Sequence, residues 1–167
     1  MTNLKPAVFF DRDGVLNIDH GYVYRSEDFE WMPGAIAAIK HFNDQGCLVF
    51  VITNQSGIAR GYYTEQDFQK LNEFMERELA KHNARIDAFY YCPHHKDGII
   101  PQYTKDCTCR KPQPGMLLKA MEEWPVDKDQ SILIGDKPSD MEAAQAAGIP
   151  GYLYQGSNLY DFVLKIF

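Results

Sequence analysis

Five short runs rich in β-branched and aromatic residues alternate with segments of helical periodicity along this chain, and this alternation most constrains its fold. One helical segment separates each run from the next. Strands and helices that alternate at this spacing form β-α-β units, which build a parallel sheet with helices on both faces. The sequence therefore predicts a three-layer, doubly wound α/β fold. Strands are expected over residues 7–10, 48–52, 88–91, 131–134 and 151–154.

Local signals mark where the helices begin and end. Pro33 and Gly34 are typical of a helix start, and Gly46 is typical of the left-handed residue that follows a helix. Thr64 can cap the next helix, with Asp67 three residues later completing a capping box. The pattern predicts helices over about 34–46, 64–79, 114–124, 139–148 and 159–166.

Length and composition indicate one folded domain. A chain of 167 residues can bury its own core, and its 45% hydrophobic and 24% charged residues exclude disordered, collagen-like and coiled-coil proteins. We therefore expect a single domain over 1–167. The net charge of −6 opposes non-specific binding to nucleic acid or to an anionic membrane. Any anionic ligand must be held by local positive charge.

The first ten residues predict a cytosolic protein with no membrane partner. They carry one lysine, and their apolar run of 7–10 is too short for a secretory signal or a membrane span. In a reducing compartment, disulfides are rare, so the 4 cysteines call for another interpretation. We expect a monomer.

Polar side chains follow three of the predicted strands. Asp11 and Asp13 come directly after the first strand, Thr53 follows the second, and Asp136 and Asp140 follow the fourth. An isolated Asp-x-Asp-Gly sequence is more often an ordinary turn than a site. Because the carboxyl ends of parallel strands meet at one edge of the sheet, these side chains are expected to lie together.

These blocks, in this order, resemble the haloacid dehalogenase superfamily of phosphohydrolases. Its motifs are Asp-x-Asp after strand one, Thr or Ser after strand two, a Lys, and an acidic pair after strand four, and the resemblance spans nearly the whole chain. It implies that Asp11 is the nucleophile and forms an aspartyl-phosphate. Asp13 would protonate the leaving group and then activate water, while Thr53 and Lys111 would bind the phosphoryl oxygens. Val15 departs from the pattern, because many members carry Thr at this position.

The same resemblance implies a catalytic magnesium ion. A phosphate monoester repels an anionic nucleophile, so a divalent cation and positive side chains must offset the charge. Magnesium suits the oxygens of Asp11, the backbone carbonyl of Asp13, and Asp136. Asp140, one helical turn beyond Asp136, is expected to orient a bound water or Lys111 without touching the metal.

The long segment 92–113 contains two groups of cysteine and histidine residues with a spacing typical of a metal site. Cys92 and His94 form one half, and Cys107 and Cys109 form the other. Three thiols and one imidazole provide the tetrahedral ligand set of structural zinc. His95 is the alternative nitrogen ligand, and four unrelated side chains are the alternative to a site. A closed zinc site would order this loop and the two cations that follow it.

Several strings narrow the resemblance to the D-glycero-D-manno-heptose 1,7-bisphosphate phosphatases. DRDGVLN, DHGYV, TNQSGIARG, YYCPHH, CTCRKPQPGM and GDKPSDM carry it. It implies removal of the C7 phosphate of a small sugar bisphosphate during nucleotide-heptose synthesis. A bisphosphate needs a second anion clamp, which Arg110 with Lys137 or Arg60 can supply. The substrate-binding residues are then expected to be Asp19, His20, Gly21, Tyr22, Thr53, Asn54, Gln55, Ser56, Arg60, Arg110, Lys111 and Lys137.

Two other functions remain open. Histidinol-phosphate phosphatases share the zinc loop, so histidinol phosphate or another small phosphomonoester is the second candidate. The third is a non-catalytic binding module held together by zinc. Turnover of an aryl phosphate with Mg²⁺ would exclude the module. Neither 11–32 nor 92–113 is long enough to form a separate cap domain, so the site is expected to be open.

Overall fold

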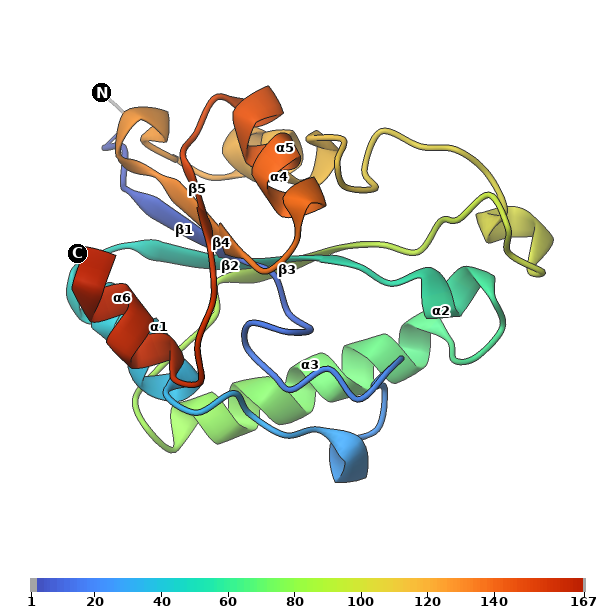
Figure 1. Ribbon diagram of the computed structural model, residues 1–167, viewed down its shortest axis with the longest axis horizontal. Helices are drawn as coiled ribbons and strands as arrows, with labels where there is room; N and C mark the ends of the chain where they lie inside the picture. Colours follow the sequence, from blue (N-terminus) through green and yellow to red (C-terminus); the bar gives the residue numbers. More distant parts are fainter. Residues whose placement is uncertain (1–2, 167) are drawn as a thin grey trace.

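A computed structural model describes residues 3–166 of the chain. Five parallel strands form one sheet in the order β3-β2-β1-β4-β5 (Figure 1). All five predicted strands are present. They are β1 (Ala7–Phe10), β2 (Leu48–Asn54), β3 (Ala88–Cys92), β4 (Ile132–Gly135) and β5 (Gly151–Leu153).

Helices cover both faces of the sheet, which confirms the three-layer fold (Figure 1). Side chains of β1 alternate between two cores: Val8 and Phe10 pack on one side, and Ala7 and Phe9 on the other. One layer consists of α1 (Ala35–Asp44), α3 (Glu65–Ala80) and α6 (Leu159–Ile166), and the other of α4 (Gly115–Glu123) and α5 (Pro138–Ala147).

The residues predicted to begin and end helices do so in the structure. Gly46 has φ +80° just beyond α1, a conformation that costs other residues free energy. Thr64 and Asp67 form the complete capping box of α3. A further short helix, α2 (Ser56–Ala59), was not predicted, because four residues carry no readable period.

The two long loops contain only single turns of 3₁₀ helix, at Ser26–Asp28 and Pro101–Tyr103. Within residues 3–166, neither loop builds a separate domain. None of the helices in this described range has the length and apolar character needed to span a membrane.

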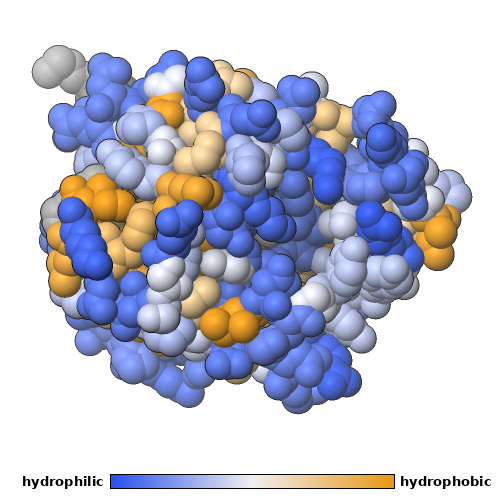
Figure 2. Space-filling view, in the orientation of Figure 1, coloured by the Kyte–Doolittle hydropathy of each residue, from blue (hydrophilic) through white to orange (hydrophobic). Residues whose placement is uncertain are grey.

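The strand order places a crevice at the carboxyl ends of β1 and β4. After β1 the chain turns to one side through β2 and β3, and it later returns to the other side of β1 as β4. Open α/β sheets bind ligands at such a switch point. Hydrophilic residues cover this region, between α5 and α2, on the face shown in Figure 2.

Candidate active site

Asp11 and Lys111 meet in the crevice beyond β1. Asp11 is the first residue after the strand and is only 5% exposed. The Lys111 ammonium donates hydrogen bonds to Asp11 Oδ1 at 3.0 Å, to Asp140 Oδ1 at 2.6 Å and to the Ile52 carbonyl at 3.2 Å. One buried cation thus connects the residue after β1, the backbone of β2 and the first turn of α5, the helix that follows β4.

Burial and the neighbouring opposite charges act in opposite directions on the pKa values of Asp11 and Lys111. Burial raises the pKa of Asp11 to about 7, although Lys111 acts to lower it. Burial would also lower the pKa of Lys111, but the carboxylates of Asp11 and Asp140 outweigh it and raise this pKa. Lys111 is therefore a stable cation, whereas Asp11 needs further positive charge to stay ionised near neutral pH.

The carboxylates around Asp11 fit a magnesium site. Oxygens of Asp11, Asp136 and Asp140 lie within 4.8 Å of one another. Asp136 Oδ1 is buried without a hydrogen-bond partner, and burial raises the pKa of this side chain. A divalent cation would satisfy that oxygen and offset the charge on both Asp11 and Asp136.

Both carboxylate oxygens of Asp140 accept hydrogen bonds from neighbouring protein groups. Its Oδ1 accepts from Lys111, and its Oδ2 accepts from the backbone N–H groups of Asp136 at 3.1 Å and Lys137 at 3.2 Å. These bonds agree with the expectation that Asp140 orients Lys111. The backbone carbonyl of Asp13 stays a predicted magnesium ligand.

Gly14 lets the loop after β1 approach Asp136 closely. Its φ is +90°, and a Cβ there would lie 2.1 Å from Asp136 Oδ2. The Asp-x-Asp-Gly sequence is thus both a turn and part of the site. Val15 is fully buried in the apolar core, which accounts for an apolar residue at this position.

Three side chains hold Asp13. Arg12 donates to Asp13 Oδ1 at 2.9 Å through Nη2, and Asn17 donates to the same oxygen at 3.0 Å. Gln55 Nε2 lies 3.3 Å from Asp13 Oδ2. Arg12 is fully buried, so this guanidinium belongs to the site rather than to the surface. The sequence pattern did not reveal these contacts; its one signal was a basic residue at the second position after an apolar strand.

The last residues of β2 and the residues that follow the strand contact other parts of the site. Thr53 is 1% exposed and accepts a hydrogen bond from Gln55 Nε2 at 2.9 Å. The Asn54 side chain accepts from the Lys111 backbone N–H at 3.0 Å and lies 3.4 Å from its carbonyl oxygen. Gln55 is 2% exposed, and Ser56 is the first residue of α2. The side chains of Asn54 and Gln55 are therefore directed at other site residues.

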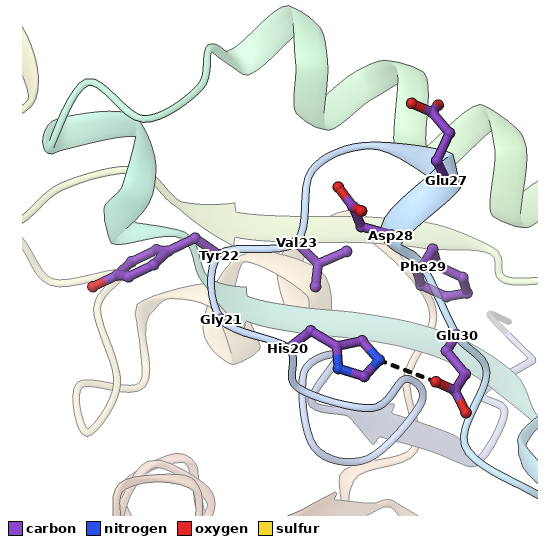
Figure 3. Close-up of a pocket in the computed structure, with 8 residues that line it drawn as sticks. All are labelled: His20, Gly21, Tyr22, Val23, Glu27, Asp28, Phe29 and Glu30. Carbon is purple, nitrogen blue, oxygen red and sulfur yellow. Dashed lines mark hydrogen bonds and ion pairs between the residues drawn. The ribbon is translucent and has the colours of Figure 1, made fainter.

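The predicted substrate loop lies beside a cavity of about 630 Å³ (Figure 3). The His20 imidazole pairs with Glu30 at 3.0 Å across this cavity. The Tyr22 ring points away from it and contacts the edge of Tyr62, with ring centres 4.8 Å apart. Asp19 accepts from the Gly21 backbone at 2.9 Å and shapes the turn. The acidic wall formed by Glu27, Asp28 and Glu30 suits hydroxyl groups better than phosphate.

Cations gather on the opposite side of the site. Arg60 Nη2 lies 3.4 Å from His95 Nε2, and burial followed by the charges of Arg110 and Arg60 lowers the pKa of His95. Arg60 Nε and Arg110 Nη1 are buried without partners. A cavity of about 340 Å³ is lined by Arg110 and Lys111 among other cations, and Lys137 is not in its lining. The structure thus brings Arg60 to Arg110 and leaves Lys137 beside Asp136.

The second metal cluster is complete. Each of its four side chains offers one ligand atom, and these atoms lie within 4.8 Å of one another. Hydrogen bonds from the neighbouring thiols, Cys92 first, lower the pKa of Cys109 to about 5, so one sulfur is readily a thiolate. His95 is turned away, toward Arg60 and Asp97, which leaves His94 as the nitrogen ligand. The cluster, which has the composition of a structural zinc site, is Cys92, His94, Cys107 and Cys109.

Comparisons with known proteins agree with this geometry. The HAD-hydrolase-like family model matches residues 108–158. A D-glycero-beta-D-manno-heptose-1,7-bisphosphate 7-phosphatase of Rhodopseudomonas palustris is 48% identical over 97% of this chain and 90% of its own. The chain belongs to this phosphatase family. The Escherichia coli K12 phosphatase of the same name is 46% identical over 89% of this chain and 78% of its own.

Two solved phosphatase structures resemble the fold closely. The D,D-heptose 1,7-bisphosphate phosphatase from B. bronchiseptica, complexed with magnesium and phosphate, superposes with a TM-score of 0.81 at 31% identity, covering 97% of this chain and 87% of that one. A HAD-like phosphatase from Mesorhizobium loti superposes with a TM-score of 0.86 at 33% identity, covering 98% and 86%. Magnesium in the B. bronchiseptica structure agrees with the oxygen donors gathered around Asp11 here.

Proposed function

We propose that this protein hydrolyses the C7 phosphate of D-glycero-D-manno-heptose 1,7-bisphosphate in nucleotide-heptose biosynthesis. One observation carries the chemistry: the buried carboxylate of Asp11 is held against Lys111 at 3.0 Å, with Asp13 two residues away in the same crevice. The names of relatives with 48% and 46% identity support the choice of substrate. We further propose that the chain acts as a monomer with a single domain.

In the first step, Asp11 attacks phosphorus. The new bond joins its carboxylate oxygen to phosphorus as the bond to the C7 oxygen breaks, and an aspartyl-phosphate results. Asp13 gives its proton to the departing C7 oxygen. Lys111 and Thr53 hold the phosphoryl oxygens. A magnesium ion bound by Asp11 and Asp136 would supply the positive charge that this anionic reaction requires.

In the second step, water attacks phosphorus and the bond to Asp11 breaks. Asp13, now ionised, takes a proton from the water. Inorganic phosphate leaves, and Asp11 returns to its carboxylate form. The three donors around Asp13 suit this stage, because an ionised carboxylate can accept a hydrogen bond from each of them.

The depth of Asp11 favours cleavage of the primary phosphate. Because Asp11 is 5% exposed, a terminal C7 phosphate can reach it more easily than a C1 phosphate attached directly to the ring. The C1 phosphate would stay at the rim, beside Arg60 and Arg110. Their buried and unpartnered N–H groups favour a second anion. Histidinol phosphate offers a cationic amine instead, so this cluster opposes it.

A parallel assay tests the substrate. Phosphate release is measured with Mg²⁺ on both anomers of heptose 1,7-bisphosphate and on histidinol phosphate. We expect the heptose bisphosphate to be cleaved with the higher kcat/KM, and phosphorus NMR to show a heptose 1-phosphate product. Preferred turnover of histidinol phosphate would overturn the proposal.

A further inference from the structure

The side chain of Gln55 joins two proposed reaction groups to a tyrosine outside the site. Its Nε2 donates to Thr53 Oγ1 at 2.9 Å and to Asp13 Oδ2 at 3.3 Å, and its Oε1 accepts a hydrogen bond from the Tyr63 hydroxyl. Every polar atom of this buried amide is therefore engaged. Tyr63 itself contacts neither Asp13 nor Thr53 through any of these bonds.

The orientation of the Gln55 side-chain amide decides whether its NH₂ group or its oxygen faces Asp13. An ionised carboxylate only accepts hydrogen bonds, so it needs the NH₂ end of Gln55. In the reversed orientation, Gln55 Oε1 would face Asp13 Oδ2, and the two oxygens would repel one another. The Tyr63 hydroxyl donates to Oε1 and so favours the observed orientation. Burial raises the pKa of Tyr63, which keeps the proton that it donates.

The same amide directs the hydroxyl of Thr53. Because Thr53 Oγ1 accepts from Gln55, its own proton must point elsewhere. The Asn54 carbonyl, at 3.4 Å, is a long and weak partner for that proton. The proton is thus available to a phosphoryl oxygen in the crevice.

Tyr63 occupies a site shaped to hold its ring. The ring is 6% exposed, stacks on Tyr24 with centres 5.2 Å apart, and packs with Ile58 and Phe68. A Cβ on Gly57 would lie 2.2 Å from Tyr63 Cε1. The absence of a side chain at Gly57 therefore lets this ring pass close to α2 and reach Gln55.

We propose that Tyr63 is a positioning residue for this reaction, which acts through Gln55 to orient the acid Asp13 and the phosphoryl ligand Thr53. The inference rests on the proposed function of these two groups. In this arrangement the tyrosine hydroxyl never touches substrate. A purely structural role would require only the ring.

Tyr63→Phe removes the hydroxyl and keeps the ring. An acid is needed most when the leaving group is a poor one, as with an alkyl phosphate, and least when it is an activated phenol. We expect kcat/KM for heptose 1,7-bisphosphate to fall by about tenfold, the effect of one hydrogen bond, with KM little changed. The fall for 4-nitrophenyl phosphate should be clearly smaller. Equal falls on both substrates, or no fall on either, would overturn the proposal.

Two further variants separate positioning from packing. Tyr24→Phe removes a hydroxyl from the ring stacked on Tyr63 and should leave both activities and the unfolding temperature unchanged. The double variant Tyr63→Phe/Gln55→Ala should be no slower than Gln55→Ala alone, because both changes break one path. Additive losses would show that Tyr63 does not act through Gln55.

Asp13→Asn distinguishes failure of this inference from failure of the proposed function. If Asp13→Asn spares the aryl phosphate but Tyr63→Phe does not, only the role of Tyr63 is wrong. If Asp13→Asn lowers kcat/KM, which reports the first step, equally on both substrates, the acid role of Asp13 fails and the inference fails with it. Should the wild-type protein not cleave the heptose bisphosphate, the same ratios are measured with a simple alkyl phosphate.

Discussion

The ammonium group of Lys111 lies inside the protein between two carboxylates, at 3.0 Å from Asp11 and 2.6 Å from Asp140. Removing one partner of a buried ion pair usually costs several kcal/mol, because the other charge is left uncompensated. Here the second carboxylate remains when the first is neutralised. The proposed nucleophile can therefore be changed without leaving the cation alone, which makes Asp11 a clean position for testing the chemistry.

Asp11→Asn should abolish turnover and leave the fold intact, since an amide is too poor a nucleophile to form the phosphoryl intermediate. We expect less than about a hundredth of the wild-type rate, a loss of more than about 3 kcal/mol in transition-state stabilisation. Circular dichroism and phosphate release measure the two properties. A higher residual rate would contradict nucleophilic catalysis by Asp11.

Gly14 offers a second test at the residue scale. In Gly14→Ala the new Cβ would lie 2.1 Å from Asp136 Oδ2, so the carboxylate must move. We expect a loss of activity and a higher Mg²⁺ concentration for half-maximal rate. Gly46→Ala is the matched control: its φ is also positive, at +80°, but nothing lies within 4 Å of the added Cβ. It should lower stability by about 1–2 kcal/mol and spare the Mg²⁺ dependence.

Some residues of the site could be predicted from the sequence, and others could not. Asp11 and Asp136 could be predicted because each directly follows an apolar strand, and strand ends meet in space. Arg12 could not, because its position next to Asp13 in the chain does not show that its side chain turns inward and is fully buried. Tyr63 was missed because it belongs to no strand end and reaches the site only through Gln55.

At the scale of elements, the strands matched the predicted apolar runs to within one or two residues at each end. β2 continues through Thr53 to Asn54, two residues beyond the predicted end at 52, because both residues pair with β3 while their side chains serve the site. Helix starts with capping signals, such as Thr64, were placed within a residue. The four-residue α2 has neither period nor cap and could not be found in this way.

The loop between β3 and α4 depends on the Cys₃His cluster more than on an apolar core. Its only regular element is the 3₁₀ turn Pro101–Tyr103, which buries none of its residues. We expect one tightly held zinc ion to purify with the chain. In Cys107→Ser, zinc content and thermal stability should both fall, because structural zinc can contribute on the order of 10 kcal/mol to local folding.

Elemental analysis and thermal unfolding check this prediction, with Cys47→Ser as the control. Cys47 is buried in the apolar core and is not part of the cluster, so its replacement should cost stability without loss of zinc. Full zinc content in Cys107→Ser, or none in the wild-type protein grown with zinc, would contradict the structural role. Loss of activity should follow indirectly, through movement of Arg110.

At the scale of the whole molecule, the charge around the site is not uniform and differs locally from the negative net charge. The net charge is −6, and the cavity beside His20 is walled by acidic residues. Arg60, Arg110 and Lys111 nevertheless gather on the other side of the crevice. A substrate with a hydroxylated sugar and two phosphates matches this division, with its hydroxyl groups toward the acidic wall and its anions toward the cations.

Arg110→Ala therefore should slow heptose 1,7-bisphosphate far more than a monophosphate that lacks the second anion. In the proposed arrangement Arg110 binds the retained C1 phosphate, so its loss should appear mainly in KM for the bisphosphate, by about tenfold or more for one charge-assisted contact. Lys40→Ala, an exposed cation on α1, alters the net charge equally and should affect neither substrate. Phosphorus NMR of the product follows the same reaction. Equal losses on both substrates, or release of the C1 phosphate first, would place the second anion elsewhere than beside Arg110.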